Sequence, residues 1–336
     1  MPGKRLTITE REEIAILLEQ GESDARIAER LDRDRTTVWR ERTRNPSPSP
    51  RAYRAFPAHI QATARARRPR ARKLDRNREL RAHVAADLAR GWSPQQVAGR
   101  LATMDRPAMR ISHETIYQAL YVQAKAGLRE QVRALAADPA RCAARRSRRP
   151  RSRAAGTGRS RIKGMVHISQ RPAEADDRAV PGHWEGDLVI GAGQGSALAT
   201  LAERSTRFVL LVPVPDRTAA SVGAALSEHI GALPAALKRS LAWDQGIEMA
   251  RHAEFSVATG VPVFFCDPHS PWQRGTNENT NRLVRDYFPK GVTDFNTVNE
   301  AELARVQDLL NNRPRKTLGY RTPAEALNDF LVATTD

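Results

Sequence analysis

Residues 141–163 constrain the fold of this chain more than any other stretch. They contain ten lysines and arginines and no acidic residue. A run of like charge with so few apolar side chains cannot bury a core and is expected to be disordered until it meets a partner. The 336 residues are therefore predicted to form separate domains on either side of this run.

The positive charge of the chain is concentrated in its front half. Residues 1–163 hold 38 lysines and arginines against 17 acidic residues, a charge of 38 − 17 = +21, whereas residues 164–336 hold 17 against 21, a charge of −4. So basic a half indicates a polyanionic partner, and nucleic acid is the commonest one. Anionic membrane is the alternative, but the sequence has no apolar run near 18 residues, no signal peptide and no lipidation motif.

The first 45 residues are predicted to form a helix-turn-helix domain that binds DNA. Residues 10–20 carry apolar side chains at helical spacing and end at Gly21. Ser23 and Asp34 are good N-cap residues for two further helices. The alternative is a three-helix bundle whose basic face is only solvated. In a helix-turn-helix the last of these helices enters the major groove, and its expected DNA contacts are Arg35, Thr36, Thr37, Arg40 and Arg44.

Residues 76–140 are predicted to form a second helical, helix-turn-helix-like DNA-binding domain, after a basic linker at 46–75. Ser93 followed by Pro94 is a strong helix start. The last helix of this domain has fewer basic residues than its counterpart in the first domain, and His113 is the DNA contact expected from it. The alternative is a purely structural or dimerising bundle.

The pattern of the sequence changes after a second basic linker, which is expected to span residues 141–170 and to be disordered. Short apolar runs rich in β-branched residues alternate with Gly, Pro and polar turns, and segments with helical spacing lie between them. Residues 171–336 are therefore predicted to form an α/β domain with a mixed five-stranded sheet. The fold class is multidomain, with all-α helix-turn-helix units followed by this α/β domain.

Three acidic residues near the ends of expected strands are the candidates for chemistry. Asp187 lies within HWEGDLVIG, Asp244 follows LAW, and Glu278 lies on the helix after the last strand. A buried carboxylate is unfavourable unless it is paired or bound to metal, and three that converge would suit Mg²⁺ or Mn²⁺. Each also has an ordinary explanation, because Asp187 can bond a neighbouring strand and Asp244 can form a turn with Gly246.

The helix that carries Glu278 also carries a base on the same face. Arg285 follows Glu278 by seven positions, which is nearly two helical turns. An acid and a base placed in this way fit phosphate and metal chemistry, or they form an ordinary solvated ion pair. Trp272, just before the helix, either orders DNA bases or packs in the core.

Long segments of the sequence closely resemble the insertion sequence 30 family of bacterial transposases. They are HWEGDLVIG, SLAWDQGIEMARH, CDPHSPWQRGTNENTN and LNNRPRKTLGYRTPAEAL in the back half, and ITEREEIAILLEQG and WSPQQVAGRL with ISHETIYQALY in the front half. The resemblance covers most of the chain. It implies an RNase H-like catalytic domain of the DDE transposase and retroviral integrase superfamily, and N-terminal helix-turn-helix units that bind the inverted repeats of the element.

By this resemblance Asp187, Asp244 and Glu278 match the DDE triad, which would hold two Mg²⁺ or Mn²⁺ ions. The last two are separated by 33 residues, which fits the compact spacing of the family. The rival acids Glu248 and Asp267 suit that spacing less well. The zinc module of retroviral integrases is absent, so no zinc is expected. The cysteines of the chain, Cys142 and Cys266, do not form a zinc site of their own. The DNA contacts expected near the triad are Arg282, Arg285 and Lys290.

The function implied is a DNA transposase that binds inverted-repeat ends, cleaves DNA with metal-activated water and joins the freed 3′-hydroxyl to target DNA. Because two ends must be held together, a homodimer or larger homo-oligomer on double-stranded DNA is expected, in the bacterial cytoplasm at the nucleoid. The alternative is a non-catalytic helix-turn-helix regulator derived from a transposase, which has no need of the three acids. A tyrosine recombinase with Tyr287 as nucleophile would need an Arg/His/Arg/Tyr constellation that nothing in the sequence resembles.

Overall fold

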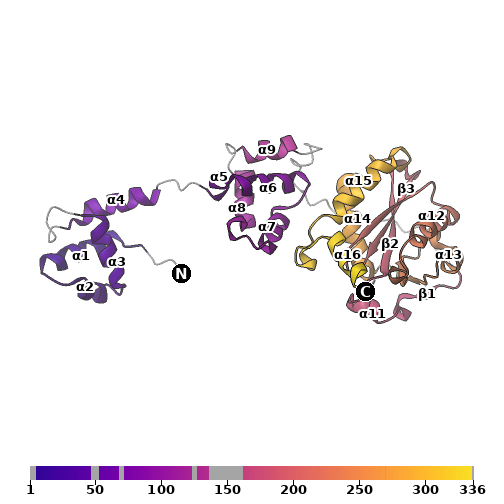
Figure 1. Ribbon diagram of the computed structural model, residues 1–336, viewed down its shortest axis with the longest axis horizontal. Coiled ribbons are helices and arrows are strands. Elements are labelled where there is room, and N and C mark those ends of the chain that lie inside the picture. The colour runs from indigo at the N-terminus through magenta and orange to yellow at the C-terminus, as the bar shows by residue number, and fades with distance from the viewer. Residues whose placement is uncertain are drawn as a thin grey trace. The chain divides into compact units, whose positions relative to one another are not determined.

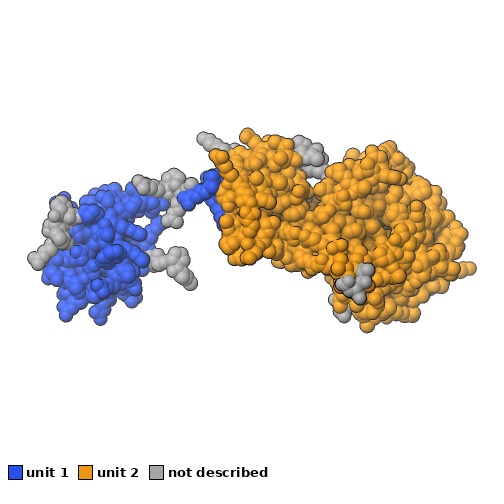
Figure 2. All heavy atoms as spheres, viewed as in Figure 1, with its two compact units in different colours: residues 1–76 blue, residues 77–336 orange. Residues whose placement is uncertain are grey.

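The computed structural model describes residues 5–46, 53–67, 72–122, 127–135, 162–268 and 270–334. It divides into two compact units, residues 1–76 and residues 77–336, which Figure 2 colours separately. Figure 1 labels the helices and some of the strands. The five-part division expected from the sequence is finer than these two units.

The first unit contains three helices in the helix-turn-helix arrangement. Each begins at a side chain that accepts a hydrogen bond from a backbone N–H of its first turn: Thr7, Ser23 and Asp34. These bonds satisfy N–H groups that a helix leaves free, and they fix where each helix begins. The helices of this unit are α1 (Ile8–Glu19), α2 (Asp24–Arg30), α3 (Arg35–Arg44), α4 (Ala55–Arg67) and α5 (Lys73–Arg76).

Helix α4 packs against α1, which corrects the expectation of a basic linker at 46–75. Its Ala58 and the preceding Tyr53 are buried in the same apolar cluster as Ile14 of α1 and Val38 of α3. The packing of this helix was difficult to predict because arginines dominate the segment. Those with described side chains, such as Arg65, are exposed, so the opposite side of the helix can pack against α1.

The second unit begins with a helical part at residues 77–135. Ser93 forms a capping box with Gln96, and Pro94 occupies the first position of the helix, as the sequence predicts. Leu80 and Ile116 are fully buried in this part. Its helices are α6 (Arg78–Ala89), α7 (Pro94–Thr103), α8 (His113–Tyr117), which continues into a π-helical turn (Gln118–Val122), and α9 (Leu128–Leu135).

The rest of the second unit is an α/β domain around a mixed six-stranded sheet. The strand order is β1-β6-β5-β2-β3-β4, in which β2, β3 and β4 run antiparallel and β1, β6, β5 and β2 run parallel. The strands are β1 (Val166–His167), β2 (His183–Ile190), β3 (Ala197–Glu203), β4 (Val209–Val214), β5 (Ser240–Trp243) and β6 (Val263–Phe265).

The expected count of five strands is wrong by one, because β1 was not foreseen. Its Val166 and His167 pair with β6, and two residues are too few to show a periodic pattern. This strand also corrects the expected disordered linker at 141–170 at its C-terminal end, since residues 162–170 are ordered against the sheet. Residues 136–161, which include Cys142, lie outside the described residues.

Helices cover both faces of the sheet (Figure 1): α12 (Ala219–Gly231) and α13 (His252–Thr259) one face, and α14 (Gly275–Tyr287) and α15 (Glu300–Asn311) the other. Along β2, Trp184 and Leu188 belong to the first apolar cluster and Val189 to the second. Because side chains alternate along a strand, Glu185 and Asp187 point to the α14 side. Two helices remain, α11 (Glu174–Asp177) and α16 (Pro323–Ala333).

Short 3₁₀ turns connect many of these elements, and none of the described helices has the length and apolarity needed to cross a membrane. The turns are Pro107–Met109, Ile168–Gln170, Ala192–Gln194, Ala235–Leu237, Ile247–Met249, Pro271–Arg274, Phe295–Thr297 and Lys316–Leu318.

Within the second unit, helix α7 contacts the segment between α15 and α16. The amide of Gln96 donates to the carbonyl of Pro314 at 2.9 Å, and Arg100 forms an ion pair with Glu325 at the start of α16. A Cβ on Gly99 would lie 2.3 Å from the ring of Tyr320, so only glycine allows this approach. Tyr320 itself has a left-handed backbone, with φ of 67°, which presents its ring to α7.

Candidate active site and DNA interface

The sheet places Asp187 and Asp244 at neighbouring positions. Strands β2 and β5 run parallel, with Glu185 opposite Ala242. Two residues further along both strands are Asp187, still within β2, and Asp244, directly after β5. The alignment of two parallel strands thus brings together two of the three acids that the sequence singled out.

One guanidinium group lies against both aspartates. Arg274 is the N-cap residue of α14. Its Nη1 is 3.5 Å from Oδ1 of Asp187 and donates to the carbonyl of Gly186 at 2.8 Å, and its Nη2 donates to Oδ2 of Asp244 at 3.3 Å. The Arg274 side chain is only 15% exposed. A buried cation between two carboxylates shows that this position stabilises positive charge.

Asp187 is the more constrained of the two aspartates. Its Oδ1 accepts the N–H of Leu188 at 2.9 Å, and its Oδ2 accepts the amide of Asn281 at 2.8 Å. Burial raises the pKa of Asp187 to about 6, Arg274 opposes this rise, and the nearby charge of Asp244 adds to it. The carboxyl group is thus oriented by donors from two elements, β2 and α14.

Asp244 forms the turn that the sequence offered as its ordinary explanation. Its Oδ1 accepts the N–H of Gly246 at 3.0 Å. Its Oδ2 is turned toward Arg274, and the side chain is 40% exposed. The turn and the contact with the bridging guanidinium therefore coexist, because they use different oxygens of one carboxylate.

The structure does not gather Glu278 with the two aspartates. Glu278 lies in the first turn of α14 and is exposed. Across the parts of the chain that the structure describes, no three His, Cys, Asp or Glu residues are arranged to hold a metal ion. Arg274 instead contacts both aspartates and offsets part of their negative charge.

The rival acids Glu248 and Asp267 have other partners. Glu248 accepts a hydrogen bond from the indole N–H of Trp243 at 3.2 Å. Asp267 contacts His167 at 2.5 Å and accepts from the amide of Gln273 at 2.9 Å. Glu248 is thus engaged by strand β5, and Asp267 is engaged by strand β1 and by the turn before α14.

The basic residues expected near the triad differ in their surroundings. Arg285 donates to the carbonyl of Ile190 at 2.6 Å, at the end of β2, and so helps to hold α14 on the sheet. Arg282 is exposed and donates to Asn279 at 2.9 Å. Lys290 is exposed after α14. Trp272 is 73% exposed, which excludes the core packing considered for it.

Sequence reasoning missed a buried polar network between α14 and the strands β2 and β3. The Asn277 amide donates to the carbonyls of Glu185 and Thr200, at 2.9 and 3.2 Å. The Thr200 hydroxyl lies 2.7 Å from Oδ1 of Asn281, whose amide reaches Asp187. Asn277 and Asn281 are four positions apart, so one helix face carries both. That spacing was the signal in the sequence.

The expected DNA-reading helix of the first unit, α3, presents most of its candidate residues to solvent. Arg35, Thr36, Arg40 and Arg44 are exposed and Thr37 is partly buried. The Thr36 hydroxyl donates to the cap residue Asp34 at 2.5 Å. Trp39, which the sequence did not single out, is 56% exposed on the same helix. In the helical part of the second unit, His113 is exposed at the start of α8.

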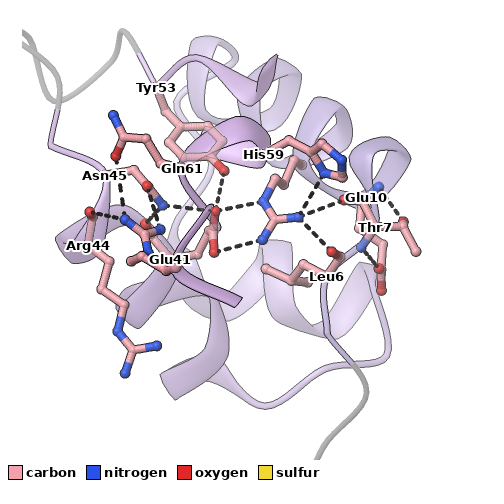
Figure 3. A network of polar contacts seen from close by, with 11 residues as sticks. Leu6, Thr7, Glu10, Glu41, Arg44, Asn45, Tyr53, His59 and Gln61 are labelled. Carbon is pink, nitrogen blue, oxygen red and sulfur yellow. Dashed lines mark hydrogen bonds and ion pairs between the residues drawn. The ribbon is translucent and has the colours of Figure 1, made fainter. Parts of the chain in front are cut away.

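A buried network holds the inner face of α3 (Figure 3). Oε1 of Glu41 accepts from Arg11 on α1 at 2.8 Å, from the Tyr53 hydroxyl at 3.0 Å and from Asn45 at 2.9 Å. Arg11 and Glu41 side chains are 6% and 10% exposed. A charge pair so buried needs several partners, and here they come from α1, α3 and the segment before α4. The network fixes how α3 presents its outer face.

Comparison with known protein families identifies two parts of the chain. Residues 3–45 match the helix-turn-helix domain family, and residues 177–271 match the integrase core domain family. Among solved structures, the catalytic core domain of BIV integrase aligns with 46% of this chain and 99% of its own, at 19% identity and a TM-score of 0.37. A helix-turn-helix joined to an integrase core defines a class of DNA-binding enzymes that transfer polynucleotides.

Relatives match over nearly the full chain. The transposase for insertion sequence element IS1086 of Cupriavidus metallidurans is 46% identical over 99% of this chain and 97% of its own length. The transposase InsI for IS30A of Escherichia coli is 42% identical over 98% and 85%, and the transposase for IS4351 of Bacteroides fragilis is 32% identical over 98% and 97%. The chain belongs to the insertion sequence 30 family of transposases, and it is a DNA transposase.

Proposed function

We propose that this transposase holds two Mg²⁺ or Mn²⁺ ions with Asp187, Asp244 and Glu278. The observation that carries the proposal is the Arg274 guanidinium against both aspartates, because the site already selects a cation and offers the hard carboxylate oxygens that these ions prefer. Glu278 completes the set from the first turn of α14, the helix that also supplies Asn281 to Asp187.

The ions, when bound, would activate the attacking oxygen and stabilise the leaving oxygen at the scissile phosphate. The chain's own residues prepare that reaction. Asn281 and the N–H of Leu188 hold the Asp187 carboxylate in one orientation. Arg274 gives up its place between the aspartates and is then free to contact the phosphate backbone. Water attacks phosphorus and displaces the 3′-oxygen, which takes up a proton and leaves as a 3′-hydroxyl. This 3′-hydroxyl later loses its proton, attacks a phosphorus of target DNA and displaces the target's own 3′-oxygen.

The partners proposed are the inverted repeats of the element and target DNA. The inverted repeats would be contacted by α3, through the exposed Arg35, Arg40 and Arg44 together with Thr36 and Thr37, and by His113 of the second unit. Arg282 and Lys290 would contact DNA near the acids, and Arg285 would act there through its hold on β2. Two ends are needed, so a homodimer or larger assembly at the bacterial nucleoid is proposed.

The test is Mg²⁺-dependent strand transfer with Asp187→Asn, Asp244→Asn and Glu278→Gln variants of the full chain. Each is expected to lose strand transfer while binding to end DNA, measured by gel shift, survives. Glu248→Gln is the matched control, because Glu248 contacts Trp243 and should keep activity. Strand transfer that persists in the Glu278→Gln variant would remove Glu278 from the site. If it persists in all three, the chemistry lies elsewhere.

A further inference from the structure

Glu185 is a fully buried carboxylate two residues before Asp187 on β2. Its exposed fraction is 0%. Burial of a charged carboxylate is strongly unfavourable unless donors surround it. Nothing in the sequence singles out Glu185, since the motif HWEGD contains two acids on the same strand face and only Asp187 matches the DDE triad.

The first set of donors to Glu185 consists of backbone N–H groups at the N-terminus of α14. Oε2 of Glu185 accepts the backbone N–H of Thr276 at 2.8 Å and that of Asn277 at 3.0 Å. Helix α14 has no side-chain cap of its own, because its N-cap residue is Arg274. A carboxylate from β2 therefore has the capping role that an Asp or Ser at the N-cap position usually has. Its negative charge also suits the positive end of the helix dipole.

The second donor to Glu185 is Arg204, which follows β3. Its Nη1 donates to Oε1 of Glu185 at 2.9 Å, and its side chain is only 7% exposed. Each oxygen of Glu185 is thus used, one by α14 and the other by Arg204.

We propose that Glu185 is a positioning residue, which caps α14 from the neighbouring strand and thereby sets where Glu278 stands relative to Asp187. The second part of this inference rests on the proposed role of Glu278. Glu278 directly follows Asn277, whose backbone binds the Glu185 carboxylate and whose side chain binds the Glu185 carbonyl at 2.9 Å. Each residue turns an α-helix by about 100°, so rotation of this first turn changes where Glu278 lies relative to the aspartates.

Two double variants separate capping from burial of charge. Glu185→Met/Arg204→Met replaces the ion pair by apolar side chains and removes the cap. Glu185→Gln/Arg204→Met also lacks both charges but keeps one oxygen, which can still face α14. Neither leaves an unpaired buried charge, which would destabilise the fold by itself. The difference between the two therefore reports the cap.

The measurement is amide hydrogen exchange of the full chain without metal, resolved over residues 275–287. In the Glu185→Met/Arg204→Met variant, the amides of Thr276 and Asn277 should exchange about tenfold faster than in the Glu185→Gln/Arg204→Met variant. Glu203→Gln is the matched control, because Glu203 is equally buried but accepts from the loop residues Gly182 and Thr206. It should leave α14 unchanged. Equal exchange in the two double variants, or an equal effect of the control, would overturn the capping role.

Binding of Mn²⁺, followed by electron paramagnetic resonance, tests the link to Glu278. Affinity is expected to fall from wild type to Glu185→Gln/Arg204→Met, and about tenfold further in Glu185→Met/Arg204→Met. Unchanged affinity alongside faster exchange would refute the control of Glu278 by Glu185. Failure of the wild-type protein to bind Mn²⁺ would instead refute the proposed metal site, and the exchange result would still decide the capping role.

Discussion

Replacing Asp187 by Asn should stabilise the metal-free protein at neutral pH, and this gain should disappear in acid. The folded protein holds the pKa of Asp187 at about 6, above its ordinary value of 3.8. A carboxyl whose pKa is raised by folding disfavours the fold when it is charged. The penalty is fully present above the folded pKa and is lost as the pH falls through about 6 toward 3.8.

The size of this effect follows from the pKa change. A rise from 3.8 to about 6 corresponds to about 3 kcal/mol, at 1.36 kcal/mol for each step of one in pKa. Asn carries no charge and escapes the penalty. The advantage of the Asp187→Asn variant in free energy of unfolding should therefore be larger at pH 7.5 than at pH 4, by an amount on the order of 2–3 kcal/mol.

Urea unfolding between pH 4 and pH 8 measures this difference, with fluorescence of the buried Trp184 and Trp243 as the signal for the α/β domain. The control is Asp216→Asn. Hydrogen bonds from Thr218 lower the pKa of Asp216, so this variant should lose stability at neutral pH, with a smaller loss in acid. A pH-independent advantage for Asp187→Asn would refute the reasoning. Mg²⁺ at pH 7.5 should favour the wild type if Asp187 is a metal ligand.

Three further changes test other contacts. Arg274→Gln removes the resident cation, so Mg²⁺ should raise the melting temperature more than in wild type; an equal rise would show that Arg274 does not compete for the site. Gly99→Val should displace Tyr320 and expose the segment before α16 to limited proteolysis, and a pattern like that of wild type would count against the contact. Glu41→Gln should destabilise the first unit by about 3 kcal/mol, because it leaves Arg11 buried without its counter-ion, whereas Tyr53→Phe should destabilise it by about 1 kcal/mol. Calorimetry that finds equal losses in the two variants would contradict the ion-pair role of Glu41.

Much of the fold could be predicted because local signals agree with it. Ser23 and Asp34 begin helices where their side chains suggest, and Ser93 with Pro94 does the same in the second unit. Apolar periodicity was also enough to predict a mixed sheet. Two elements were not predicted. Strand β1 has only two residues and so shows no periodic pattern, and the many arginines in and around α4 make its apolar side difficult to recognise.

The candidate site was predictable only in part, for a physical reason. Asp187 and Asp244 were found because an acid beside an apolar strand is unusual whatever its partners are. The Arg274 bridge and the buried position of Glu185 depend on how α14 crosses β2, and no pattern within one segment contains that information. The same is true of Glu278, whose exposed position differs from the convergence that the sequence suggested.

The contact of α7 with Tyr320 bears on attempts to redirect this enzyme to new DNA sequences. Residues 1–76 form their own compact unit, so they are the natural piece to exchange for another DNA reader. The helical part at 77–135 is different, because Gln96, Gly99 and Arg100 fit surfaces supplied more than 200 residues later. A graft of that part would have to bring residues 313–325 with it, and any chimera that ignores this pairing would join two surfaces that were never matched.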